Sequence, residues 1–87
     1  MNTYHLKIAT PDGNMLDEDV IALYLRGAAG DLAVLAGHTP FVTTVKPGEC
    51  RVETADGTEK SGQTDGGILT VTKETVTLLS GTFQWKD

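Results

Sequence analysis

The stretch from Gly30 to Gly48 constrains the fold most, because it forces the chain to turn sharply several times. Gly37, Pro40 and Pro47 also interrupt it. Glycine tolerates positive φ, and proline fixes φ and lacks an N–H. The apolar runs between these residues are too short for helices, yet they carry side chains that need burial: Leu32, Val34, Phe41 and Val45. We therefore expect this segment to join two layers of sheet and to present a corner.

Most of the remaining chain has the pattern of short strands separated by turns. Residues 3–9 and 49–54 alternate apolar and polar side chains with period two, which indicates half-buried strands. Asp56-Gly57 is a strong hairpin signal, and the polar return over 58–64 predicts an edge strand or an outward-facing strand. No window shows the spacing of an amphipathic helix. The sequence predicts an all-β domain: a small antiparallel β-sandwich or flattened barrel of about ten short strands.

The segment before the corner is less regular. Residues 11–14 predict a turn, Met15 and Leu16 a brief strand, and 17–19 a solvated acidic run. From 19 to 26, apolar side chains occur at both parities. Two interpretations stay open: a strand that is covered on both faces or lies at the centre of the sandwich, or a strand whose outer face docks onto a partner.

Length and charge exclude several classes of partner. With 87 residues, the chain forms one domain with one thin core. Its formal net charge is −5 and its seven basic residues are scattered, which disfavours nucleic acid and anionic lipid as ligands. No signal-peptide pattern and no run of 18 apolar residues is present, so we expect no direct membrane insertion.

No motif for catalysis, metal binding or cofactor binding stands out. His5, His38 and Cys50 are far apart in the sequence, and Cys50 is expected to face inward, where a thiol is inert. We therefore expect no catalytic residue, no metal and no cofactor. For His38 two interpretations stay open: a side chain that satisfies turn backbone, or an exposed contact residue on a rigid corner.

Three stretches carry a family resemblance. They are Thr3-Tyr4-His5-Leu6; the segment 30–48 with Gly37-His38-Thr39-Pro40 and Val45-Lys46-Pro47-Gly48; and Gly66-Gly67-Ile68-Leu69 followed by Val71. Together they resemble the N-terminal β-sandwich of the epsilon subunit of rotary ATP synthases, which is called delta in mitochondria. The resemblance covers nearly the whole chain, with Ala33 and Ala36 where the family usually has Gly and Pro.

The resemblance implies a non-catalytic central-stalk subunit that couples the gamma subunit to the c-ring, so that proton or sodium flow drives ATP synthesis. Such a subunit is peripheral, on the cytoplasmic face of the inner or plasma membrane. The resemblance implies c-ring contacts at Gly27, Ala28, Ala29, Gly30, Asp31 and Leu32, and gamma contacts at His38, Thr39, Pro40, Phe41, Val42 and Thr43.

The resemblance also implies what this chain lacks. Most bacterial members continue into a two-helix C-terminal domain, which inhibits ATP hydrolysis and in some species binds ATP. Because the sequence ends at Asp87, we expect a single sandwich domain over 1–87, without inhibitory helices and without ATP binding. The alternative from another class is a free-standing β-sandwich module that recognises a protein or a glycan.

Overall fold

The computed structural model describes residues 2–86, which contain nine strands and no helix, so no helix there could cross a membrane. The strands are β1 (Tyr4–Thr10), β2 (Gly13–Gly27), β3 (Gly30–Leu35), β4 (Phe41–Val45), β5 (Gly48–Thr54), β6 (Glu59–Thr64), β7 (Gly67–Val71), β8 (Thr75–Ser80) and β9 (Phe83–Trp85). The predicted all-β class is confirmed.

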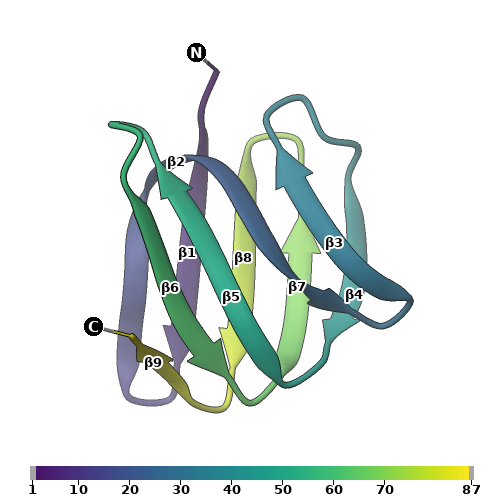
Figure 1. Ribbon diagram of the computed structural model, residues 1–87. Coiled ribbons are helices and arrows are strands. Elements are labelled where there is room, and N and C mark those ends of the chain that lie inside the picture. Colours follow the sequence, from purple (N-terminus) through teal and green to yellow (C-terminus); the bar gives the residue numbers. More distant parts are fainter. Residues whose placement is uncertain (1, 87) are drawn as a thin grey trace.

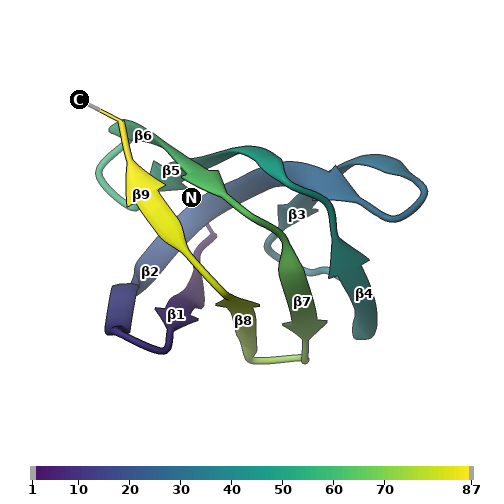
Figure 2. The ribbon, with the colours of Figure 1, turned by 90° about the horizontal axis from the view of Figure 1, so that it is seen from below.

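The strands form two layers that share β2 (Figures 1 and 2). One layer, here called the back layer, contains β1, β8, β7 and β4. The front layer contains β3, β5, β6 and β9 together with the second half of β2. The first half of β2 pairs with β1, and the second half pairs with β5 and β3. A single long strand therefore closes one side of the sandwich.

The 15-residue β2 differs from the brief strand that the sequence predicts before the corner. Asp17, Glu18 and Asp19 are exposed, as expected, but they lie inside β2 and pair with β1. The register with β5 shifts between Val20 and Ala22, which marks a bulge where the strand passes between layers. A bulge changes which face of the strand the following side chains take. Apolar residues therefore occur at both odd and even positions, although both faces of β2 are not covered. In this stretch β2 lies between β3 and β5, which agrees with a position at the centre of the sandwich, and docking of its outer face onto a partner stays a prediction.

Two further details differ from the expected antiparallel arrangement. β1 and β8 pair in parallel, with Leu6 opposite Val76, while every other pairing among residues 2–86 is antiparallel. The polar strand β6 pairs with β5 on one side and, over Gly62 to Thr64, with β9 on the other. The edge-strand alternative for this segment is thus wrong where β9 covers it.

The core lies between the layers and takes side chains from eight of the nine strands. Its fully buried large members are Leu6, Ile8, Leu23, Leu69 and Leu78, and Cys50 is buried among them, as predicted. Gly67 begins β7 at a point where the chain meets β8 closely. A Cβ atom there would lie 1.9 Å from the Leu79 carbonyl oxygen, so only glycine fits.

Candidate docking surface

The hairpin between β2 and β3 forms a short, well-held tip. Gly27 pairs with Gly30, leaving only Ala28 and Ala29 in the exposed turn. Gly30 has φ +130°, a conformation that favours glycine. Behind the tip, Gly27 pairs with Val45 of β4, and the adjacent Lys46 N–H donates to the Arg26 carbonyl at 2.8 Å. The tip is therefore fixed to both layers.

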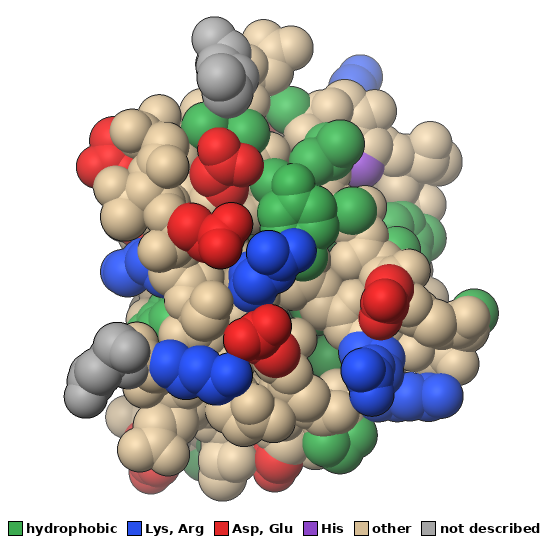
Figure 3. Space-filling model, viewed as in Figure 1, with side chains coloured by type: hydrophobic (Ala, Val, Ile, Leu, Met, Phe, Trp, Pro, Cys, Tyr) green, Lys and Arg blue, Asp and Glu red, His purple; other side chains and the backbone are tan. Residues whose placement is uncertain are grey.

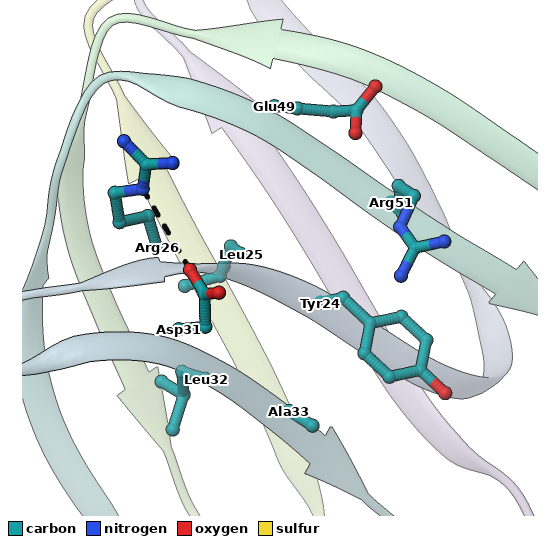
Figure 4. Close-up of a pocket in the computed structure, with 8 residues that line it drawn as sticks. All are labelled: Tyr24, Leu25, Arg26, Asp31, Leu32, Ala33, Glu49 and Arg51. Carbon is teal, nitrogen blue, oxygen red and sulfur yellow. Dashed lines mark ion pairs between the residues drawn. The ribbon is translucent and has the colours of Figure 1, made fainter.

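Asp31 is the most exposed charged group of this tip. Its side chain is 95% exposed and lies 3.8 Å from the Arg26 guanidinium, at the limit of an ion pair. Figure 4 shows the pair at the mouth of a groove between β3 and β5. An exposed pair at this distance contributes less than about 1 kcal/mol. The carboxylate is thus free to exchange Arg26 for a basic group on a partner.

The groove beside the tip has a volume of about 410 Å³. The Arg51 guanidinium lies 5.0 Å from the centre of the Tyr24 ring, a cation–π contact visible in Figure 4. Acidic and basic side chains are interspersed over the whole front face, with an apolar area between them (Figure 3). The groove has no single-sign charge, so it does not select an anion or a cation by field alone.

His38 holds the corner that follows β3. Its Nδ1 lies 2.8 Å from the Leu35 carbonyl oxygen and its Nε2 lies 2.7 Å from the Thr72 carbonyl oxygen. Whichever nitrogen carries a proton donates to one of these carbonyls. Its ring also contacts the ring of Tyr4 edge-on, at 5.3 Å between centroids. His38 therefore satisfies turn backbone, as the first of its two interpretations states, and it links the corner to the turn between β7 and β8.

Tyr4 connects the two layers beneath this corner. It belongs to β1 of the back layer, and its hydroxyl donates to the Val34 carbonyl of β3 at 2.6 Å. Burial raises the pKa of the Tyr4 phenol, so the hydroxyl keeps its proton and remains a donor. Because β3 lies at the edge of the front layer, this bond fixes the strand between the tip and the corner.

An apolar patch covers the outer face of the back layer. Val42 of β4 is 66% exposed, and Ile68 of β7 lies opposite Leu79 of β8, with 47% and 54% of these two residues exposed. Thr44 is opposite Ile68, and Thr70 is opposite Val42, so these threonines are the cross-strand neighbours of the aliphatic side chains. Exposed aliphatic side chains gathered on one face are typical of a contact surface.

The structure brings the predicted site residues into two groups at the two ends of β3, the first of which includes Gly30, Asp31 and Leu32 of that strand. Those from 27 to 32 form the tip, and those from 38 to 43 form the corner and the start of β4. Six strand residues span about 20 Å. Within the second group Thr39, Pro40 and Val42 are exposed, while His38, Phe41 and Thr43 are half-buried.

Sequence reasoning missed the roles of Tyr4, Ile68 and Leu79. A signal for the last two was present, because Ile68-Leu69 and Leu78-Leu79 are adjacent apolar pairs within strands, and one member of each pair must face outward. No sequence signal identified Tyr4 as a link between layers, since that contact depends on the distance between β1 and β3. Among residues 2–86, no group of three potential metal ligands comes together.

Comparison with known proteins gives the class of the fold first. A family model described as the ATP synthase Delta/Epsilon chain β-sandwich domain matches residues 3–86. A chain in the structure titled Euglena gracilis mitochondrial ATP synthase, OSCP/F1/c-ring superposes with a TM-score of 0.90 at 27% identity, over 95% of this chain and 53% of that one. A second, from the Tetrahymena thermophila mitochondrial ATP synthase central stalk/c-ring, gives 0.79 at 12% identity over 94% and 66%, which supports the fold alone.

Curated relatives give the particular family. The sodium ion specific ATP synthase epsilon chain of Acetobacterium woodii is 36% identical over 98% of this chain and 64% of its own length. The ATP synthase epsilon chain of Polaromonas naphthalenivorans is 38% identical over 94% of this chain and 59% of its own length. The chain thus spans about three fifths of the length of these relatives. It belongs to the ATP synthase delta/epsilon chain family, as its sequence motifs predicted.

Proposed function

We propose that this chain is a non-catalytic rotor subunit of an ATP synthase and couples the gamma subunit to the c-ring. The observation that carries the proposal is the match of the whole sandwich, residues 3–86, to the family domain, together with its superposition on a chain of an F1/c-ring assembly. In this role the protein is peripheral, at the cytoplasmic face of the membrane, and flow of protons or sodium ions drives ATP synthesis in the catalytic head.

The geometry supports coupling because the two contact groups are held stiffly relative to each other. The tip is fixed by the β2–β4 closure, and the corner by His38 and by the Tyr4 bond to β3. Backbone hydrogen bonds between strands run through the whole intervening structure. A domain of this kind transmits torque from a ring at the tip to a shaft along the corner, where a flexible linker would yield.

In this arrangement the tip, residues 27–32, contacts the polar loops of the c-ring, and Asp31 pairs with a basic loop side chain. The corner, residues 38–43, contacts the gamma subunit. Val42 supports this assignment, because it is the most exposed of the large hydrophobic residues within 2–86 and it starts the apolar patch of the back layer. No nucleotide is required for either contact.

The tip assignment is tested by Asp31→Lys, with Asp12→Lys as the matched control. Asp12 is an exposed carboxylate in the turn between β1 and β2, and Figure 1 shows that this turn lies at the opposite side of the domain from the β2–β3 hairpin. In the co-expressed complex we expect Asp31→Lys to reduce c-ring recovery and ATP-driven pumping, with gamma still bound, and Asp12→Lys to change neither. Equal recovery and pumping for both variants would show that the tip assignment is wrong.

The corner assignment is tested by Val42→Glu, with Gln63→Glu as the control that adds the same charge to the exposed side of β6. Both sites are exposed, so the free energy of unfolding of each variant should lie within about 0.5 kcal/mol of that of the parent. Val42→Glu should weaken binding to purified gamma subunit, and Gln63→Glu should not. If the unmodified chain does not copurify with gamma at all, the central-stalk proposal itself fails.

A further inference from the structure

The strand β3 has an open edge. Within residues 2–86 it pairs with β2 alone, from Gly27 opposite Gly30 to Ala22 opposite Leu35. In an antiparallel ladder that starts at a hydrogen-bonded pair of this kind, alternate residues point their backbone groups at the partner. Leu32 and Val34 therefore bond to β2, while the backbone N–H and C=O groups of three residues point away from it: Asp31, Ala33 and Leu35.

These outward backbone groups are mostly unused. Among residues 2–86, Asp31 and Ala33 have no backbone partner on that side, and the only group with a polar neighbour is the Leu35 carbonyl, whose oxygen lies 2.8 Å from His38 Nδ1. Proteins usually protect such an edge with a proline, a lysine or a bulge. Between 30 and 35 the sequence has none of these, and the register with β2 is unbroken. The open edge is thus suited to accept another strand.

The side chains along the edge favour an apolar strand. Leu35 is 50% exposed and Ala33 is exposed, both on the outer face of the front layer. Val34, which lies between them, is buried, and Leu32 is half-buried; both pack in the core. A strand laid against β3 would therefore place its outward side chains beside Ala33 and Leu35, and the residue between them beside the buried Val34. That alternation describes an extended segment with small or aliphatic side chains.

We propose that an extended segment of the gamma subunit adds to β3 as an extra strand, with its main backbone hydrogen bonds to Asp31 and Ala33. This inference rests on the proposed function, because it takes gamma as the partner at residues 38–43. β3 ends at Leu35, directly before that corner, so a segment that leaves the corner meets the open edge at once. The added backbone hydrogen bonds fix the axial position of gamma relative to the tip.

A second copy of this chain fits the edge less well. Twofold antiparallel pairing centred on Ala33 would set Asp31 opposite Leu35 of the other copy. The His38 ring lies against the Leu35 carbonyl, with Nδ1 at 2.8 Å from its oxygen, so it stands in the way of the terminal backbone hydrogen bonds. Each copy also carries a formal charge of −5. Like charges oppose such pairing, so a different protein is the better occupant.

The direct test is amide hydrogen exchange, read residue by residue by NMR, on the isotope-labelled chain alone and bound to purified gamma. Leu32 and Val34 serve as internal controls, because their amides bond to β2 and should be protected in both states. The amides of Asp31 and Ala33 should exchange freely in the free protein and slow at least about tenfold in the complex. A complex in which both amides exchange as in the free chain would overturn strand addition and leave gamma binding intact.

Ala33→Pro gives a second test, with Ala33→Val as the matched variant. Proline removes the outward N–H and is tolerated at a sheet edge, whereas valine keeps the N–H and favours a strand. Continued protection of Leu32 and Val34 would verify that Ala33→Pro is folded. We expect its affinity for gamma to fall by about tenfold relative to Ala33→Val, about the loss of one hydrogen bond. Equal affinities would contradict the proposal, and failure of every variant to bind gamma would overturn both this inference and the proposed function.

Discussion

Gly67→Ala should destabilise the protein strongly, because the added methyl group meets backbone on β8. The new Cβ would lie 1.9 Å from the Leu79 carbonyl oxygen and 2.9 Å from its carbon. To reach 3.0 Å from the oxygen, β8 must retreat by about 1.1 Å, which is the difference between 3.0 and 1.9 Å. Backbone atoms cannot rotate aside as a side chain does. The retreat separates two adjacent pairs of the β7–β8 ladder, Gly67 with Ser80 and Ile68 with Leu79.

The expected loss can be worked out from these contacts. Two weakened ladder hydrogen bonds cost about 1 kcal/mol each, and the backbone conformation at φ +154° adds about 1–2 kcal/mol for a residue with a Cβ. The sum is about 3–4 kcal/mol. A chain of this length has a free energy of unfolding of about 4–13 kcal/mol, so the variant loses a large share of it. With a urea slope of about 1–1.5 kcal/mol/M, the midpoint should fall by about 2–4 M.

Gly13→Ala is the control that isolates the contact from the backbone conformation. Gly13 has φ +131°, yet a Cβ there would meet no atom within 4 Å. It should therefore lose only the conformational part, about 1–2 kcal/mol. Urea titrations followed by far-UV circular dichroism and by the fluorescence of Trp85, which packs against the core, would measure both variants. Equal losses, or a Gly67→Ala protein as stable as the parent, would refute the close-approach argument.

Two further predictions concern the core and the hydrogen bonds that His5 of β1 makes with Asp17 and Asp19 of β2. Leu78→Ala should lower the free energy of unfolding by about 2–5 kcal/mol because Leu78 is fully buried, whereas Leu79→Ala, at the half-exposed neighbouring position, should cost about 1 kcal/mol or less in the same urea titration. Hydrogen bonds from His5, first to Asp17 and then to Asp19, raise the pKa of His5 above its ordinary value of about 6.5. Stabilisation by a raised pKa is complete below the unfolded pKa and is lost as pH rises through the folded pKa. Raising the pH from 5.5 to 8.5 should therefore lower the urea midpoint more in the parent than in His5→Gln. Equal pH dependence would show that the hydrogen bonds of His5 do not contribute to stability.

The sequence determined most of the local structure because strand periodicity and turn chemistry are short-range properties. Alternation over 3–9 and 49–54 predicted β1 and β5, and Asp56-Gly57 predicted the hairpin that follows β5. Trp85 packs against the sandwich and donates from Nε1 to the Met15 carbonyl at 3.0 Å. The glycine- and proline-containing motifs were also sufficient to identify the family.

The sequence did not predict where a strand passes between layers or which strands become neighbours. The bulge of β2 near Ile21, the parallel pairing of β1 with β8 and the cover that β9 provides for β6 all depend on residues distant in the chain. A period-two pattern shows that one face of a strand is buried, but it does not show what buries it. The same limit left the link from Tyr4 to Val34 unseen.

The composition, alternation and punctuation of the chain by themselves determined an all-β sandwich of the delta/epsilon family, with a glycine- and proline-rich corner. Only the tertiary structure decided that β3 keeps an open edge, that His38 is committed to two carbonyls, and that Val42, Ile68 and Leu79 share one exposed face. The physical reason is that turns and strands follow from neighbouring residues. An edge or a patch exists only after distant strands have occupied, or left unoccupied, the positions around it.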